Sequence, residues 1–209
     1  MARLLALRTL GPTVGPERLA ELEEEAATSL REGNWTVVIA THGALAEAYR
    51  RVDRPEDSRH TLATASGVIG SHTGGVPQVQ AQLLGAYGYI EAACGRFEEA
   101  ADYHRRALTS AVSAHDGPII ANCLQGWADL ALRQGDPARA AELLGAAHRL
   151  RGIPDRSSTD VALVTAAATE ALGEEAFTAA YERGRTTPSQ ETISSLGVAP
   201  AQIPAFDEF

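Results

Sequence analysis

The chain has 209 residues, of which 44% are hydrophobic and only 5% aromatic, and its formal net charge is −9. This length is enough to bury one sizeable core or a continuous stack of small ones. A nucleic-acid binder needs a basic face to displace counterions from phosphates, so the acidic balance argues against direct binding of DNA or RNA.

Cysteine usage and hydropathy predict the compartment. The two cysteines, Cys94 and Cys123, form no CxxC motif, so a disulfide scaffold is not implied and a reducing environment fits. The apolar run within residues 1–10 is too short for a signal peptide, and no stretch of the sequence is long enough to span a membrane. We therefore expect a cytoplasmic protein that does not bind membranes.

After an N-terminal segment of residues 1–15, residues 16–34 are predicted to form a capping helix. Leu19, Leu22, Ala26 and Leu30 recur at helical spacing and define its apolar face. The glutamate-rich run at residues 21–25 is typical of a solvated face, and a docking surface is the alternative. Helical repeats need terminal caps with a polar outer face, which this helix would supply.

Residues 35–152 are predicted to form three helix pairs, because one pattern of large and small residues recurs. Residues 84–100 align without gaps with residues 124–140, at an offset of 40 positions. A weaker copy lies upstream at an offset of 42, where Asp53 replaces the glycine that ends the first helix in the other copies.

Each recurring position has a physical reason. The small positions are Ala46, Gly88 and Ala128 in the first helices and Ser58, Ala100 and Ala140 in the second. Small side chains let two antiparallel helices pack closely. Gly95 and Gly135 supply the left-handed residue that ends a helix, and Pro55 and Pro137 suit the first turn of the next one.

This spacing resembles the tetratricopeptide repeat (TPR), whose usual period is about 34 residues. The period here is 40 to 42, with the excess falling in residues 66–77 and 113–118. Either the second helices or the loops are longer than usual. The resemblance implies an all-α fold, a right-handed α-solenoid of antiparallel helix pairs with about nine or ten helices.

The C-terminal part is predicted to contain further helices over residues 153–196, packing on the array, and a loose tail over residues 197–209. The blocks at residues 135–151, 172–177 and 181–185 are similar to the C-terminal TPR region of large bacterial ATPase-type transcriptional regulators. That resemblance implies a regulatory or sensor role in transcription or signalling. The chain shows neither a nucleotide-binding module nor a helix-turn-helix, so it would be a fragment or a stand-alone relative.

No catalytic, cofactor or metal site is predicted. The motifs GxxxxGK[ST], GxSxG, HExxH and CxxC do not occur, and no two of the six histidines are three or four positions apart. The glycine-rich residues 70–75 are interpreted as an inter-repeat loop, with a phosphate site as the alternative. His104, Trp35 and Trp127 are interpreted as packing residues, and a Cys–His nucleophile pair between neighbouring helices stays an open alternative.

In the TPR family the first helices of the pairs line a concave groove, where partners bind. Helical spacing from the small positions predicts the exposed groove residues. They are Glu47, Arg50 and Arg51 from the first pair, Gln82, Gly85 and Tyr89 from the second, and Asn122, Gln125, Asp129 and Arg133 from the third. A groove with two arginines at one end would suit an acidic peptide or a terminal carboxylate. The alternative is that these are ordinary solvated helix positions.

Three classes of function follow. The first is a protein-interaction module that holds a protein or peptide segment in the groove, with a homodimer as an open alternative for assembly. The second is a helical sensor that binds a small effector, which an enclosed apolar pocket would favour. The third, an enzyme on a helical scaffold, has no supporting group of residues, and fold alone does not decide among them.

Overall fold

The computed structural model describes residues 14–72 and 76–199, and within them the chain forms ten α-helices and no strand. The helices are α2 (Pro16–Glu32), α3 (Trp35–Arg51), α4 (Pro55–His72), α5 (Pro77–Ala93), α6 (Phe97–Ser113), α7 (Gly117–Arg133), α8 (Pro137–Arg151), α9 (Thr159–Leu172), α10 (Glu174–Thr186) and α11 (Ser189–Ser195). The predicted all-α, TPR-like solenoid of helix pairs is confirmed. No helix in the described residues is long and apolar enough to cross a membrane.

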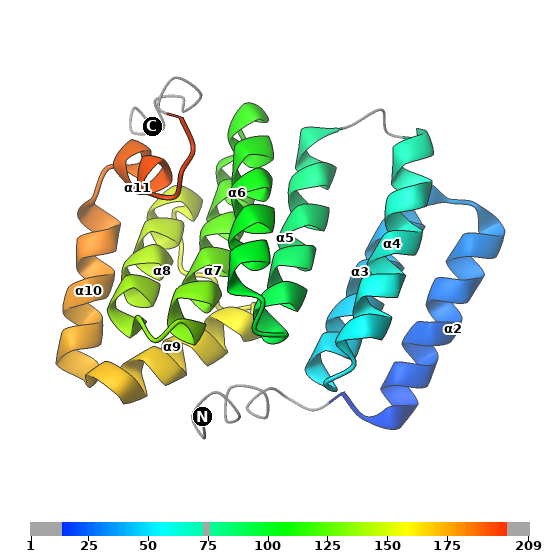
Figure 1. Ribbon diagram of the computed structural model, residues 1–209, viewed down its shortest axis with the longest axis horizontal. Coiled ribbons are helices and arrows are strands. Elements are labelled where there is room, and N and C mark those ends of the chain that lie inside the picture. The colour runs from blue at the N-terminus through cyan, green and yellow to red at the C-terminus, as the bar shows by residue number, and fades with distance from the viewer. Residues whose placement is uncertain (1–13, 73–75, 200–209) are drawn as a thin grey trace.

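The central helices stack as three pairs, α3 with α4, α5 with α6, and α7 with α8 (Figure 1). The first helix of each pair ends at a left-handed residue, which is Gly95 (φ 77°) after α5 and Gly135 (φ 87°) after α7. Asp53 takes the same conformation (φ 59°) after α3, so the weaker first copy keeps the turn without its glycine. Asp136 caps α8 by accepting a hydrogen bond from the Arg139 amide at 2.9 Å.

The lengths of the helices explain the long repeat period. Each of α3, α5, α6 and α7 has 17 residues, and α4 has 18. The excess therefore lies in long first helices as well as long second helices, rather than in the loops between repeats. Residues 70–72 belong to the end of α4 and not to the predicted glycine-rich loop, whose residues 73–75 lie outside the described part of the chain.

Small residues at the pair contacts allow this close stacking. Ser58, Ala100, Ala128 and Ala140 are fully buried, and the Ser58 hydroxyl donates a hydrogen bond to the Ala46 carbonyl at 2.6 Å. Trp127 packs against the main core, as predicted. Trp35 does not, because it begins α3 at the outer end of the array, where its side chain is 37% exposed.

Helix α2 covers the other side of α3, with Leu22 and Ala26 packed against Leu45 and Tyr49. At the opposite end of the array, α10 packs along α8, and α9 lies across α7 and α8 (Figure 1). The tail predicted to be loose is packed at its start, because Val198 is only 2% exposed and belongs to the main core. Residues 1–13 of the N-terminal segment and 200–209 of the tail lie outside the described residues.

The tightest helix contact joins α8 and α10 through two glycines. A methyl group at Gly145 would lie 2.0 Å from the Tyr181 carbonyl oxygen, and one at Gly184 would lie 1.8 Å from the Glu142 carbonyl oxygen. Both obstacles are backbone atoms, which cannot rotate away. The two backbones therefore approach closely only because neither residue has a side chain.

We expect Gly184→Ala to lower the free energy of unfolding by roughly 1–3 kcal/mol, because it forces α10 away from α8. The matched control is Gly67→Ala in α4, where a methyl group would meet nothing within 4 Å. That change should raise the free energy by up to about 1 kcal/mol, through helix propensity. Urea unfolding followed by circular dichroism measures both, and equal effects of the two substitutions would contradict the close-contact assignment.

Candidate functional site

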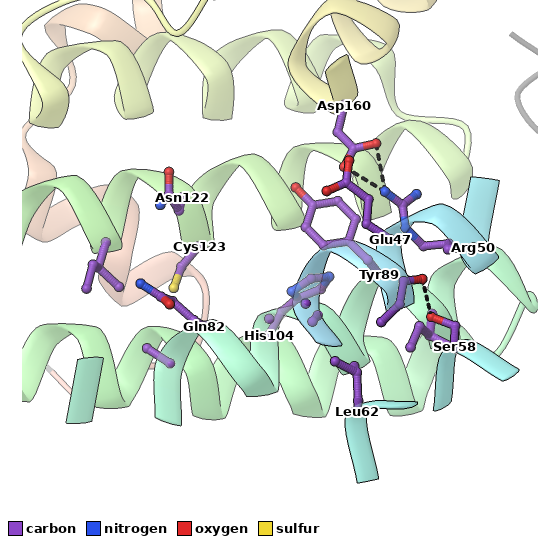
Figure 2. A pocket seen from close by; sticks show the side chains of 17 residues that line it. Glu47, Arg50, Ser58, Leu62, Gln82, Tyr89, His104, Asn122, Cys123 and Asp160 are labelled. Carbon is purple, nitrogen blue, oxygen red and sulfur yellow. Dashed lines mark hydrogen bonds and ion pairs between the residues drawn. The ribbon is translucent and has the colours of Figure 1, made fainter. Parts of the chain in front are cut away.

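The first helices α3, α5 and α7 line one side of the stack, and a cavity of about 240 Å³ opens there between the first two pairs. Figure 2 shows the side chains around it, which come from five helices of the array and from the start of α9. Its walls are mostly apolar, with Leu62, Ile90 and Ile119 among them. Polar groups are few and lie at the rim, at one end and on the floor.

Five predicted groove residues with side chains meet at this cavity. They are Glu47, Arg50, Gln82, Tyr89 and Asn122, and Gly85 lies beside them. Glu47, Gln82 and Asn122 are exposed at the rim. The Asn122 side-chain oxygen also accepts a hydrogen bond from Arg151. The exposure expected from helical spacing is seen for Glu47, Gln82 and Asn122, whereas the Arg50 side chain is only 11% exposed.

The other half of the groove is covered by the chain itself. Gln125, Asp129 and Arg133 are buried, with exposures of 7%, 6% and 9%, and not exposed as helical spacing predicts. The Gln125 amide donates to Asp155 at 3.1 Å, and the Arg133 guanidinium donates to Asp129 at 2.7 Å. Asp155 belongs to the C-terminal part of the chain, whose helix α9 packs on α7.

Asp160, in the first turn of α9, closes the end of the cavity. Both of its carboxylate oxygens accept hydrogen bonds from the same Arg50 nitrogen, at 2.9 and 2.7 Å. Arg51 lies 3.5 Å from Asp160 and also pairs with Glu47. The two arginines predicted to bind an acidic partner thus already form ion pairs with carboxylates of the chain itself, as Figure 2 shows for Arg50.

The aromatic residue of the site lies beside this ion pair. The Arg50 guanidinium carbon is 5.2 Å from the centre of the Tyr89 ring, within cation–π range. Burial lowers the pKa of Arg50, but the adjacent Asp160 carboxylate more than offsets this, and the pKa is raised overall. Burial also raises the pKa of Tyr89 well above its usual value, with Asp160 and Asp129 adding to the effect, so the phenol is neutral.

The floor of the cavity contains a residue from the second-helix layer, His104 of α6. Its ring reaches between α5 and α7 at two glycines, since a methyl group at either Gly88 or Gly126 would lie 2.5 Å from its Cε1 atom. The ring packs edge-on against Tyr89, with centroids 5.5 Å apart. His104 is fully buried, and neither ring nitrogen has a hydrogen-bond partner within the described residues.

Burial sets the protonation state of the two remaining reactive groups. It lowers the pKa of His104 to about 3, so the imidazole is neutral at physiological pH. It raises the pKa of the Cys123 thiol to about 12, so this wall residue is a protonated thiol rather than a nucleophilic thiolate. The described residues contain no group of three or more side chains that could hold a metal ion.

Sequence reasoning missed Asp160 and took His104 only as a packing residue. Asp160 sits two positions after Ser158, which caps α9, and an acidic residue in a first helical turn is too common to signal a long-range partner. His104 carried a signal that could have been used. The helix paired with α6 contains Gly88, and the next first helix contains Gly126. These two glycines leave the space that a buried ring needs.

Comparison with known protein families supports the repeat assignment for part of the chain. Residues 79–152 match the model of the tetratricopeptide repeat family, which covers α5 to α8 apart from the first residues of α5. The match supports the predicted resemblance to this family for the second and third pairs. No curated protein and no solved structure shows a significant match to the chain.

The protonation of His104 makes stability depend on pH. Its pKa is about 3 in the folded state and about 6.5 when unfolded, so the unfolded chain binds the proton more readily. We expect this contribution to be fully present above pH 6.5 and to be lost progressively as the pH falls toward 3. Urea unfolding at pH 7 and pH 4.5 measures it, and His104→Leu should flatten that difference.

The matched control is His60→Leu, at an exposed histidine of α4. It should leave the difference between the two pH values as in the wild type. An equal pH dependence in wild type and His104→Leu would contradict a buried, neutral His104.

Proposed function

We propose that the chain is a TPR interaction module that holds a segment of a partner protein along the open half of its groove, above the cavity between α3, α5 and α7. The repeats themselves support an interaction role, because the family is generally a non-catalytic scaffold for binding proteins. The observation that carries the proposal is that three pairs contribute exposed polar side chains to a single rim. These are Glu47, Gln82 and Asn122.

The chemistry of this rim suits recognition of a peptide backbone. Gln82 and Asn122 carry amide groups whose N–H donors match the C=O groups of an extended segment. Gln82 adds an acceptor for an N–H group, whereas the Asn122 oxygen already accepts from Arg151. The acidic partner expected from Arg50 and Arg51 has less support, because Asp160 and Glu47 already occupy those cations. We therefore propose that side chains of α5 and α7 recognise the partner mainly through its backbone, and not through its charge.

We further propose that this module is the regulatory part of a bacterial transcriptional or signalling regulator. The support is the order of sequence blocks over residues 135–185, from which the sequence analysis predicts a resemblance to the C-terminal region of ATPase-type regulators. A partner carrying a nucleotide-binding module or a DNA-binding domain would agree with this role. A partner of unrelated function would remove its support and leave the interaction module standing.

Site-specific photo-crosslinking tests the groove. A photoreactive amino acid replaces Gln82 at the rim or, as the matched control, Glu98, which is exposed at the start of α6 in the second-helix layer. After irradiation in a native lysate, we expect one dominant protein adduct from position 82 that is missing from position 98. Identical adducts from both positions, or none from position 82, would contradict binding along the groove.

A further inference from the structure

A second hollow, which we call the C-terminal crevice, lies between α8, α9 and α10 (Figure 1). Its lining comes mainly from one stripe of each helix, within residues 144–151, 161–166 and 177–181, and from the loop residues 154–156. Its volume is about 560 Å³, within the range of roughly 300–1,000 Å³ that is usual for small-molecule sites. It shares no lining residue with the cavity between the first two helix pairs.

The apolar walls of the crevice come from all three helices. Leu144, Val161 and Phe177 line it, one from each helix. The ring of Phe177 stacks on that of Tyr181, with centroids 5.9 Å apart, and both rings face the crevice. Ala166 of α9 also lines it and is exposed, because an alanine methyl group is too short to fill the space. The crevice therefore offers apolar surface to a molecule that brings apolar area of its own.

The one carboxylate that lines the crevice is engaged within the chain. Asp155 accepts hydrogen bonds from the Gln125 amide at 3.1 Å and from the Ser157 amide and hydroxyl at 3.1 and 2.9 Å, and it pairs with Arg151 at 3.3 Å. Burial raises the pKa of Asp155, but the hydrogen bonds from Ser157 and Gln125 more than offset this, and the pKa is lowered overall. Asp155 is therefore ionised at neutral pH, and its charge compensates that of Arg151.

One cation of the crevice has no such counter-charge. Arg156 lines the crevice, is exposed, and forms no ion pair or hydrogen bond with another residue of the described chain. His148 adds no charge near neutral pH, because burial and the nearby Arg185 lower its pKa, and its Nδ1 atom is hydrogen-bonded to the Tyr181 hydroxyl at 2.9 Å. With two arginines and one aspartate, the lining is thus net positive in a chain whose net charge is −9.

We propose that the C-terminal crevice binds a small amphipathic monocarboxylate, of the class of medium-chain fatty acids. Its hydrocarbon chain lies between α8, α9 and α10, and its carboxylate pairs with Arg156. The hydrocarbon chain supplies most of the affinity, because its removal from water is favourable in proportion to its area. The exposed arginine contributes less and selects the anion. This site does not depend on a protein segment binding at the groove.

Chain-matched probes test the proposal on the intact protein. Decanoate, decanol and decylammonium have the same hydrocarbon chain with a negative, a neutral or a positive head group. Below the concentrations at which they form micelles, we expect decanoate to bind saturably in calorimetric titrations and to shift the NMR methyl resonances of Ala162 and Ala166, which line the crevice. Decanol should bind about threefold to fivefold more weakly, which is the effect of one exposed charge pair, and decylammonium more weakly still.

Two pairs of variants locate the site, with folding checked by circular dichroism. Ala166 and Ala171 are both exposed on α9, and only Ala166 lines the crevice. We expect Ala166→Phe to abolish saturable decanoate binding and Ala171→Phe to leave it unchanged. Arg156→Gln should remove the preference for decanoate over decanol, whereas Arg106→Gln, which removes the same charge from α6, should keep it.

The proposal is overturned if decanoate does not bind the wild type saturably. It is also overturned if decanol binds as tightly as decanoate, or if Arg156→Gln and Arg106→Gln have equal effects, because Arg156 would then select nothing. Decanoate binding that survives Ala166→Phe would place the ligand elsewhere on the protein. None of these results bears on crosslinking at Gln82, so the two proposals fail separately.

Discussion

The ion pair between Arg50 and Asp160 connects α3 of the first helix pair to α9, which packs on the third pair. The two residues are 110 positions apart in the sequence, and their side chains are only 11% and 18% exposed. Removing such a pair from water carries a desolvation penalty that is offset only by good geometry and further contacts. Here both carboxylate oxygens accept hydrogen bonds, and the guanidinium also lies against the Tyr89 ring.

The functional surface depends on this connection. With Asp160 held against α3, helix α9 lies across α7, the helix in which Gln125, Asp129 and Arg133 are buried. The groove expected along all three pairs is thus divided into a covered half and an open half. Asp160 also forms the end of the cavity, so the same contact bounds the space above His104.

Local features of the fold could be predicted from the sequence, and long-range ones could not. The alternation of large and small residues and the turn glycines follow from contacts within a pair, and these predicted the helix pairs. The crossing of α9 depends on which distant surface its apolar face meets, and an Ala-rich helix gives no sequence signal for that choice. Helical spacing therefore predicted Gln82, Tyr89 and Asn122 as groove residues, which the structure places around the cavity, and gave no reason to expect Arg133 to be buried.

A double-mutant cycle on Arg50 and Asp160 tests the central claim, that this ion pair holds α9 across the groove. The free energy of unfolding is measured in urea for the wild type, Arg50→Ala, Asp160→Ala and the double variant. We predict that each single variant loses about 3 kcal/mol, because it leaves a buried partner without its counter-charge, and that the coupling is about 2 kcal/mol. The exposed pair Arg18 and Glu21 provides the matched control and should couple by less than about 0.5 kcal/mol. Additive losses for Arg50 and Asp160 would contradict the account, because the two side chains would then contribute to stability independently.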